Sequence, residues 1–461
     1  MRKFLLLYGL LVSITLQAQL ITYPEGLQTG ITHNDDYTVC VRIPGGEWKD
    51  LFEYRVQVDM DKVQDASMVQ FDMAQPVEVR VKKNNGMIQK VKIRPTAAGI
   101  DFRQEQNMIT FTLDRPRYLS IEFNEDCLHN LHLFANSPET ETYSKEENGV
   151  LYFGPGVHRP KDLPNNQIRI PSNTTVYLAP GAVLKAKLLV DKVENVRIIG
   201  RGILDHPARG VEVTDSKNVL IDGITVLNPE HYTVFGGGSK DVTIKNLKSF
   251  SCTKWSDGID MMCCRDVLVD NVFMRNSDDC IALYNHRWNW WGGSDNITVQ
   301  NSILWADIAH PINIGGHGDP ESQEGEIIEN LVFRNIDILE HDEDDTPYQG
   351  CMAIDAGDKN IVRNVLFENI RVENIQEGRL FHVNVRFNKK YDKQPGQLID
   401  RVTFRNITYT GIGENPSLIK GLDKERNVRN VTFENVVING KRMNSIKEFV
   451  TNDYVENVIV K

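Results

Sequence analysis

Residues 194–200 are ENVRIIG, and residues 217–223 and 240–246 repeat this phrase as KNVLIDG and KDVTIKN. Within each phrase apolar residues alternate with polar ones, which is typical of a strand with one buried face. The many valines and isoleucines favour strand over helix, because β-branched side chains pack well on a pleated surface. The spacing begins near 23 residues and lengthens later, with further copies starting at residues 265, 295, 329, 363, 400, 429 and 456.

A repeat of this length predicts a solenoid whose coils carry loops of variable size. Leucine-rich repeats have a similar period, but here the leucine consensus is missing and no coil contains a helix-length periodic segment. We therefore predict an all-β chain whose larger part is a parallel β-helix. We expect its recurrent asparagines to bond to the backbone and to the next coil. Residues 169–184 are expected to form the first coil.

The N-terminal part of the chain lacks the repeated phrase. Residues 77–81 and 108–113 instead alternate in short runs, and turn signals such as residues 83–86 separate such runs. This pattern predicts a smaller antiparallel β-sandwich packed against the β-helix. The sandwich could bind a ligand or brace the solenoid, and we favour bracing because an apolar sandwich face needs a neighbour. We place the sandwich domain at residues 19–145 and the β-helix domain at residues 146–461.

The first residues have the charged, apolar and small-residue order of a secretory signal, which we expect to end at residue 18. We therefore expect a periplasmic or secreted protein. No later apolar stretch reaches the length that a bilayer requires. The net charge of -11 disfavours nucleic acid and anionic membranes as partners, since both reward a basic face. We expect a monomer.

Seven cysteines form no spaced framework, and the adjacent Cys263 and Cys264 lack the usual two-residue gap between zinc ligands. We interpret the cysteines as small buried hydrophobes. We expect no cofactor.

Two acidic motifs and a histidine motif follow one another: residues 256–260 are SDGID, residues 277–280 are SDDC and residues 315–318 are GGHG. The first two lie about one repeat apart, so stacked coils would bring their carboxylates close together on one outer wall. Crowding raises the proton affinity of one carboxylate and leaves another ionised, which is the pair that glycosidic bond hydrolysis needs.

The resulting hypothesis is that Asp257, Asp278 and Asp279 are catalytic, with His317 tuning them and without a metal. Each motif alone is more often a turn or a solvated surface. A calcium site is the other use of clustered carboxylates on a β-helix, and it stays open.

Tryptophan placement adds an independent indication. Five of the six tryptophans lie in the fifty-odd residues that span the acidic motifs, and aromatic faces stack well on sugars. The loop at residues 285–293 interrupts the coil just after the Asp pair, where a substrate-binding loop is expected. Filling of the core is the alternative for Trp255 and Trp305. The residues predicted here to bind substrate are Trp255, Asp260, Arg287, Trp288, Trp290 and Trp291.

With these motifs, residues 150–460 resemble the polygalacturonase-like β-helix glycosidases, glycoside hydrolase family 28 and the related dextranase and isopullulanase family 49. The resemblance implies a right-handed parallel β-helix, a pectin-lyase-like solenoid. Family 28 shows Asn-Thr-Asp, Asp-Asp and Gly-His-Gly in the order found here. Carried over, these motifs make Asp278 the general acid, and Asp257 and Asp279 the groups that position and deprotonate water. His317 supports them, and the anomeric configuration is inverted.

Two departures from family 28 bear on the substrate. Pectinases of that family carry an Arg-Ile-Lys that holds a uronate carboxylate, whereas residues 350–357 here are GCMAIDAG. A β-sandwich before the β-helix and the Asp-Gly-Ile-acid pattern resemble the dextranase-like family. The resemblance therefore implies hydrolysis of a neutral polysaccharide or oligosaccharide. The alternative is a pectin-type hydrolase, polygalacturonase or rhamnogalacturonan, in which Arg379, His382 and Arg386 receive an anionic group.

Two other classes stay open at this point. A β-helix polysaccharide lyase needs a Lys or Arg base and usually calcium, and the acidic wall offers poor cations for that role. A non-catalytic carbohydrate-binding solenoid needs no acid–base chemistry. Carboxyls one strand step apart lie nearer the spacing of retaining enzymes, so inversion rests on the resemblance alone. The glycan, its linkage and the choice between internal and terminal cleavage stay open.

Overall fold

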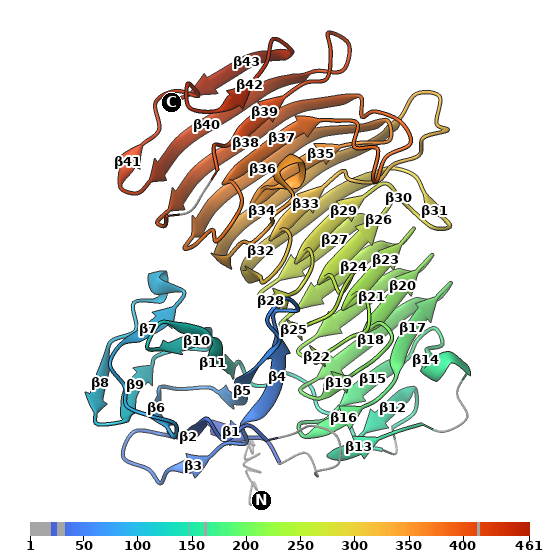
Figure 1. Ribbon diagram of the computed structural model, residues 1–461. Coiled ribbons are helices and arrows are strands. Elements are labelled where there is room, and N and C mark those ends of the chain that lie inside the picture. Colours follow the sequence, from blue (N-terminus) through green and yellow to red (C-terminus); the bar gives the residue numbers. More distant parts are fainter. Residues whose placement is uncertain (1–19, 25–32, 146, 161–163, 413–414) are drawn as a thin grey trace, which may run out of the picture.

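The computed structural model describes residues 20–24, 33–145, 147–160, 164–412 and 415–461. The predicted signal peptide lies outside this range. The chain forms a long right-handed parallel β-helix with a smaller N-terminal β-domain packed against its side (Figure 1), so the predicted fold class is confirmed. Within the described ranges, no helix has the length and apolar character needed to cross a membrane.

The N-terminal β-domain consists of two sheets with a shared apolar core. The first sheet has the order β1-β5-β11-β10-β7 with β4 on β5, and its strands are β1 (Leu20–Thr22), β4 (Tyr54–Val58), β5 (Gln64–Met73), β7 (Val91–Arg94), β10 (Arg117–Phe123) and β11 (Asp126–Asn136). The second sheet has the order β3-β2-β6-β9-β8, with β2 (Tyr37–Arg42), β3 (Lys49–Asp50), β6 (Val77–Lys83), β8 (Phe102–Glu105) and β9 (Met108–Leu113).

One strand pair corrects the prediction of an antiparallel sandwich. Strands β5 and β11 lie side by side and run parallel, from Leu131 opposite Ser67 to Asn136 opposite Asp72. The chain between them passes through the second sheet before it returns, and a crossover of this kind allows parallel pairing where a hairpin cannot.

Most coils of the β-helix contribute one strand to an 11-stranded parallel sheet and one or two strands to a longer, bent sheet. The strands of the 11-stranded sheet are β14 (Gln167–Arg169), β17 (Lys187–Asp191), β20 (Val211–Thr214), β23 (Val234–Gly237), β26 (Ile259–Met262), β29 (Ile281–Tyr284), β33 (Ile312–Ile314), β35 (Met352–Ala356), β37 (Phe381–Val385), β39 (Leu418–Lys420) and β42 (Val450–Thr451).

The bent sheet contains short strand pairs in the early coils and single long strands from β32 onward. Its strands are β12 (Val150–Phe153), β13 (Gly156–His158), β15 (Thr175–Leu178), β16 (Ala182–Leu184), β18 (Glu194–Gly200), β19 (Ile203–Asp205), β21 (Lys217–Asp222), β22 (Thr225–Leu227), β24 (Lys240–Lys245), β25 (Lys248–Phe250), β27 (Arg265–Asp270), β28 (Phe273–Asn276), β32 (Ser294–Ala306), β34 (Glu326–Glu340), β36 (Asn360–Val372), β38 (Leu398–Tyr409), β40 (Val428–Ile438), β41 (Lys441–Arg442) and β43 (Val455–Val460). A hairpin, β30 (His286–Arg287) with β31 (Trp290–Trp291), and the 3-10 turns η1 (Thr96–Ala98), η2 (Pro164–Asn166) and η3 (Thr346–Tyr348) lie in loops.

The repeated phrase explains how the coils stay in register. Its second residue adopts the left-handed conformation, as in Asn195 with φ 59° and Asn218 with φ 55°, and asparagine tolerates that conformation better than most residues. The Asn218 amide donates to Asn195 at 2.8 Å, and Asn195 donates to Asn173 at 2.9 Å. The expected bonding of asparagines between coils is therefore confirmed.

The solenoid begins one coil earlier than predicted. Strand β12 pairs with β15, with Val150 opposite Thr175, so β12, β13 and β14 form a coil before residues 169–184. Within the described structure, this end coil has another coil on one side only. Its turns therefore need no asparagine bonds to a preceding coil. Its sequence therefore lacks the repeated phrase.

No disulfide joins the cysteines in the part of the chain that the structure describes, and Cys263, Cys264, Cys280 and Cys351 are buried, as interpreted from the sequence. Three others differ from that interpretation because they lie in partly exposed parts of the two domains: Cys40, Cys127 and Cys252.

The two domains share a continuous apolar interface. Met68 and Phe134 of the N-terminal domain pack in one cluster with Phe273 and Trp305 of the β-helix, and the rings of Phe134 and Phe273 lie 5.0 Å apart. Trp305 is fully buried, so it fills the core rather than binding ligand. The bracing role is consistent with this interface.

Buried ion pairs cross the same interface. Arg94 contacts Glu340 at 2.6 Å and Glu373 at 2.8 Å, and Arg201 contacts Asp72 at 3.1 Å. Charges buried in this way need partners with good geometry, so these pairs fix one relative placement of the two domains.

We predict that Phe134→Ala lowers the free energy of unfolding by about 3–5 kcal/mol, because it opens a cavity between the domains. The control is Phe102→Ala in the same domain, where the ring is 39% exposed and the expected change is within about 0.5 kcal/mol. Urea unfolding followed by tryptophan fluorescence measures both. Equal stability of the two variants would contradict the interface described here.

Candidate active site

Three neighbouring strands of the 11-stranded sheet, β26, β29 and β33, position the central residues of the site. Asp257, Asp279 and His310 each lie two positions before a strand, and the register pairs Ile259 with Ile281 and Ile281 with Ile312. The Gly258 N–H donates to the Asp279 carbonyl and the Cys280 N–H to the His310 carbonyl, both at 2.8 Å. The three side chains therefore occupy one position in three stacked coils.

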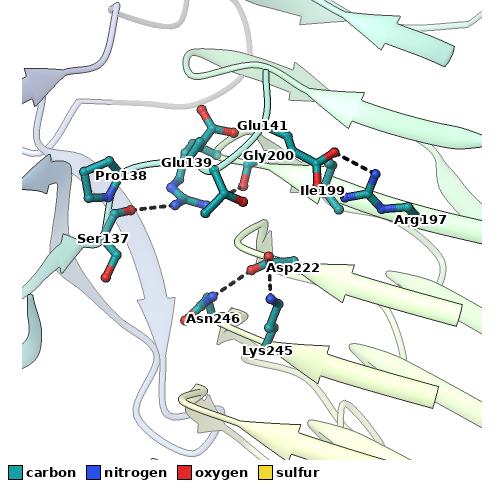
Figure 2. A pocket seen from close by; sticks show the side chains of 12 residues that line it. Ser137, Pro138, Glu139, Glu141, Arg197, Ile199, Gly200, Asp222, Lys245 and Asn246 are labelled. Carbon is teal, nitrogen blue, oxygen red and sulfur yellow. Dashed lines mark hydrogen bonds and ion pairs between the residues drawn. The ribbon is translucent and has the colours of Figure 1, made fainter. Parts of the chain in front are cut away.

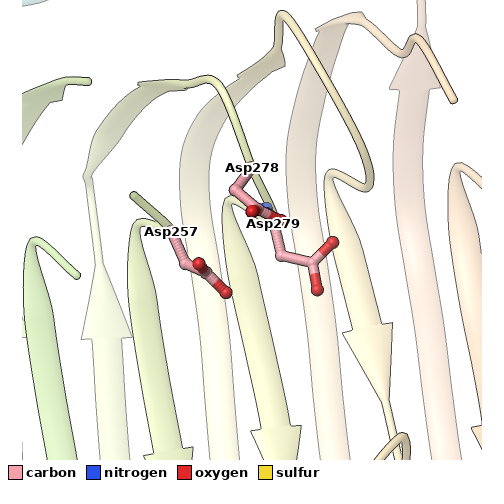
Figure 3. Close-up of side chains that lie close together, drawn as sticks. All are labelled: Asp257, Asp278 and Asp279. Carbon is pink, nitrogen blue, oxygen red and sulfur yellow. The ribbon is translucent and has the colours of Figure 1, made fainter. Parts of the chain in front are cut away.

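The carboxylates of Asp257, Asp278 and Asp279 converge (Figure 3). One oxygen from each lies within 4.8 Å of the others. Asp278 and Asp279 come from the turn before β29, and Asp257 comes from the neighbouring coil. Gly258 permits this approach, because a Cβ there would lie 2.2 Å from the Cys280 carbonyl oxygen.

Asp279 is built to be an anion. Its Oδ1 accepts from the backbone N–H of His310 at 3.1 Å and from the His310 ring at 2.6 Å, while its Oδ2 accepts from Asn313 at 2.7 Å and Tyr284 at 3.0 Å. Burial alone would raise the pKa of Asp279, but His310 and these donors outweigh burial and lower it.

His310 is the cation beside this anion. One ring nitrogen faces the Asp279 carboxylate and the other faces the Tyr348 carbonyl oxygen, so both nitrogens meet acceptors and both carry protons. Burial opposes the charge, but Asp279 raises the pKa of His310 to about 9. His310 was not predicted from the sequence. The pattern that would have identified it is its position two residues before an apolar strand, which Asp257 and Asp279 also occupy.

His317, which was predicted to support the carboxylates, follows β33 and lies at its other end. Its Nε2 is 3.4 Å from Arg287, and its ring packs edge-on against Tyr284 at 4.8 Å. Burial and the charges of Arg287 and Arg386 lower the pKa of His317 to about 3. His317 is therefore neutral. It lines the same cleft as the three aspartates, but the histidine that hydrogen-bonds to one of them is His310, so the supporting role of His317 stays a prediction.

Asp278 has the opposite character to Asp279. Burial and the neighbouring Asp279 charge raise the pKa of Asp278 to about 7. Its oxygens accept from the backbone N–H groups of Trp255 at 3.1 Å and Asp279 at 3.0 Å, which fix its orientation. Near neutral pH this turn thus holds one carboxyl that retains a proton beside one that has lost it.

Asp257 has a second carboxyl beside it, that of Asp260 in β26. Asp260 is fully buried, and neither of its oxygens has a hydrogen-bond donor among the described residues. Burial and repulsion within the cluster raise the pKa of both side chains, so this pair retains a proton. The prediction that Asp260 contacts substrate is therefore wrong, because its carboxyl cannot be reached from solvent.

The carboxylates open into a cleft of about 340 Å³. Trp255 stands at its edge with 61% of its surface exposed, and Arg287 also lines it, as predicted for both. The remaining lining residues include Met60, Tyr232, Lys254, Tyr284, Ile308, Ala309, Glu343, Tyr348, Lys390 and Tyr391.

The tryptophans of the loop at residues 285–293 do not line this cleft. Trp290 packs against Phe235 at 5.1 Å, and Trp291 stacks on His286 at 3.3 Å. Trp288 packs against Phe235 at 5.2 Å. Trp288 and Trp290 share Phe235 as a neighbour, whereas Trp288 and Trp291 keep 39% and 51% of their surface exposed, so the contact of these three rings with substrate stays a prediction.

Arg379 and His382 are also outside the cleft. Arg379 donates to the Thr346 carbonyl oxygen at 3.1 Å, and His382 lies 3.1 Å from Asp355 with no exposed surface. Their predicted role in substrate binding is wrong in this structure, because both side chains are buried and neither lines the cleft.

The three carboxylates have the chemistry of a calcium site, since Ca²⁺ takes six to eight oxygen ligands. The environment of Asp279 fits this use poorly. Its two oxygens already accept four hydrogen bonds, which occupies the lone pairs an ion would need. The arrangement favours proton transfer.

A separate cavity of about 130 Å³ lies where the N-terminal domain joins the β-helix (Figure 2). Its polar groups pair with one another: Arg197 contacts Glu141 at 2.9 Å, and Lys245 contacts Asp222 at 3.3 Å. These pairs indicate a structural junction.

The model of the family "Glycosyl hydrolases family 28" matches residues 175–455. Curated relatives include Probable exopolygalacturonase B of Aspergillus terreus, 25% identical over 267 residues, with 50% of this chain and 57% of the relative covered. Exopolygalacturonase B of Aspergillus niger is 25% identical over 236 residues, with 48% and 51% covered. The chain thus matches little more than half the length of these relatives.

Two solved structures share the fold. Dex49A from Penicillium minioluteum has a TM-score of 0.64 at 16% identity, with 96% of this chain and 99% of that chain covered. The family 28 exopolygalacturonase of Yersinia enterocolitica has a TM-score of 0.52 at 13% identity, with 83% and 96% covered.

We predict that Asp278→Asn changes how stability depends on pH. The pKa of Asp278 is about 7 in the folded chain and about 3.9 when unfolded, so its contribution is present at low pH and is lost as pH rises through 7. Relative to wild type, Asp278→Asn should therefore gain about 4 kcal/mol between pH 4 and pH 8.

Urea unfolding at several pH values measures this difference. Asp101→Asn, at an exposed position of the N-terminal domain, is the control and should follow the wild-type curve. A constant offset between Asp278→Asn and wild type across the range would contradict the prediction.

Proposed function

The chain belongs to glycosyl hydrolases family 28, and from this premise we propose that it is a glycoside hydrolase that inverts the anomeric configuration of a polysaccharide or oligosaccharide. The observation that carries the proposal is the contrast between Asp278, whose pKa is raised to about 7, and Asp279, whose pKa is lowered. Neighbouring carboxyls with opposed proton affinities are what acid–base hydrolysis of a glycosidic bond requires.

In this mechanism Asp278 donates its proton to the leaving glycosidic oxygen. Asp279, held ionised by His310, and Asp257 hold the attacking water, and its proton passes to this carboxylate pair. Inversion is supported by family membership rather than by carboxylate spacing, because oxygens within 4.8 Å do not by themselves indicate a water-sized gap.

The substrate follows from the charges in the cleft. The absence of the Arg-Ile-Lys triplet favours a neutral glycan, which is our first candidate. Arg287 favours the second, a glycan that contains uronate, because it lines the cleft and its guanidinium lies 3.4 Å from the neutral His317 ring. A panel of α-glucans and pectic oligosaccharides separates the two, and Arg287→Gln should impair only the second.

We predict that Asp278→Asn reduces hydrolysis by about 10²–10⁴-fold and leaves glycan binding intact, because the amide cannot donate the proton. Product chromatography on the glycan panel measures turnover, and a proton spectrum of the first-formed anomer tests inversion. Asp101→Asn should behave as wild type.

Two other outcomes separate the remaining classes. Loss of activity in chelator together with an unsaturated, ultraviolet-absorbing product would indicate a lyase. Glycan binding by wild type without turnover would indicate a non-catalytic solenoid.

We predict that His310→Gln shifts the acidic limb of kcat/KM upward by about one pH unit or more, because Asp279 loses the cation that keeps its pKa low. His317→Gln is the matched comparison and should leave this limb in place, since the His317 ring does not contact Asp279 in the described structure. The pH–rate profiles of both variants measure this. Equal shifts of the acidic limb in the two variants would contradict the prediction, because His317 would then support Asp279 as much as His310 does.

A further inference from the structure

The turn between β4 and β5 of the N-terminal domain reaches the catalytic cleft. Met60 on this turn lines the cleft together with Asp278, Ile308 and Ala309. Within the described structure, Met60 is the N-terminal-domain residue that lines this cleft. The bracing domain thus supplies part of the wall beside the proposed acid.

Backbone hydrogen bonds attach the turn to the β-helix at two points. The Met60 N–H donates to Ser277 Oγ at 3.1 Å, and the Asp59 N–H donates to Asp307 Oδ2 at 3.2 Å. Ser277 directly precedes Asp278, and Asp307 directly precedes Ile308. The turn is therefore joined to the two segments that carry the acid and the apolar wall.

The turn and its anchor are both rigid. Asp59 adopts φ 56°, and its side chain accepts from the N–H groups of Asp61 at 3.0 Å and Lys62 at 3.1 Å. Asp307 is held by Arg275 at 3.0 Å, and Arg275 also donates to Asn130 of the N-terminal domain at 3.0 Å. The backbone at Met60 is thus held in place by hydrogen bonds on both sides.

We propose that Met60 is a substrate contact, and that the N-terminal domain through this turn forms the subsite next to Asp278; the proposal rests on the function proposed above. Met60, Ile308 and Ala309 are the aliphatic residues that line the cleft, beside its charged and aromatic residues. The C–H face of a pyranose ring packs on such side chains, and the flexible, polarizable thioether adapts to it. The ligand class is a sugar ring, neutral or uronic.

The test uses the full chain. Met60→Ala removes the side chain and keeps the N–H bond to Ser277, whereas Val63→Ala changes an exposed side chain on the same turn that does not line the cleft. As a single substitution, Met60→Ala should raise KM about 3- to 10-fold and leave kcat and the pH profile unchanged. Val63→Ala should leave KM, kcat and the pH profile unchanged. Thermal melting confirms that both variants fold.

A second arm measures affinity without turnover. In the Asp278→Asn background, calorimetry with isomaltotriose and trigalacturonate should show about 3- to 10-fold weaker binding after Met60→Ala for the probe that binds. If wild type hydrolyses glycans and Met60→Ala binds them as tightly, this inference fails and the proposed function stands. If wild type binds but never cleaves, the proposed function fails while the affinities still decide the role of Met60. Absence of binding to both probes and to the whole glycan panel overturns both.

Discussion

The vertical register between coils is the constraint on which the site depends. Each coil is hydrogen-bonded to the next through its backbone, and left-handed asparagines such as Asn195 and Asn218 repeat the same turn in successive coils. A side chain at a given position therefore lies about 4.8 Å from its equivalent in the next coil. Asp257, Asp279 and His310 occupy one such column. The fold thus forces like charges together, and its backbone bonding sustains the repulsion.

Burial acts to raise the pKa of every carboxyl in the cluster, so the differences among them come from their partners. Asp279 receives four hydrogen bonds, including those of the His310 cation, and ionises. Asp278 receives two backbone donors and keeps its proton near neutral pH. Asp260 receives none within the described structure and is buried. Acid and base roles are therefore assigned by the second layer of contacts rather than by the identity of the residues.

This second layer marks the limit of what the sequence predicts. The repeated phrase predicts the coils, and its period brings Asp257 and Asp279 together. His310 escapes prediction because it follows Asp279 by 31 residues, after an inserted loop that hides the repeat, while the Gly-His-Gly motif nearby attracts the assignment. Arg379 was misjudged for a related reason: whether a cation faces solvent depends on loops such as residues 346–349, whose packing no periodicity encodes.

The column also explains why a second domain bears on the site. Asp279 belongs to this column of equivalent positions and is fixed by the backbone pairing of the coils. Asp278 lies one residue before it, in a turn that the repeat does not constrain. Its position depends on local anchors: the Trp255 N–H on its carboxylate and Ser277, which accepts from Met60 of the N-terminal domain. The β-helix positions Asp279, the proposed base, through its own repetition, whereas the turn that carries Asp278, the proposed acid, is also hydrogen-bonded to the N-terminal domain. The buried interface around Trp305 and Phe134 keeps that support in place.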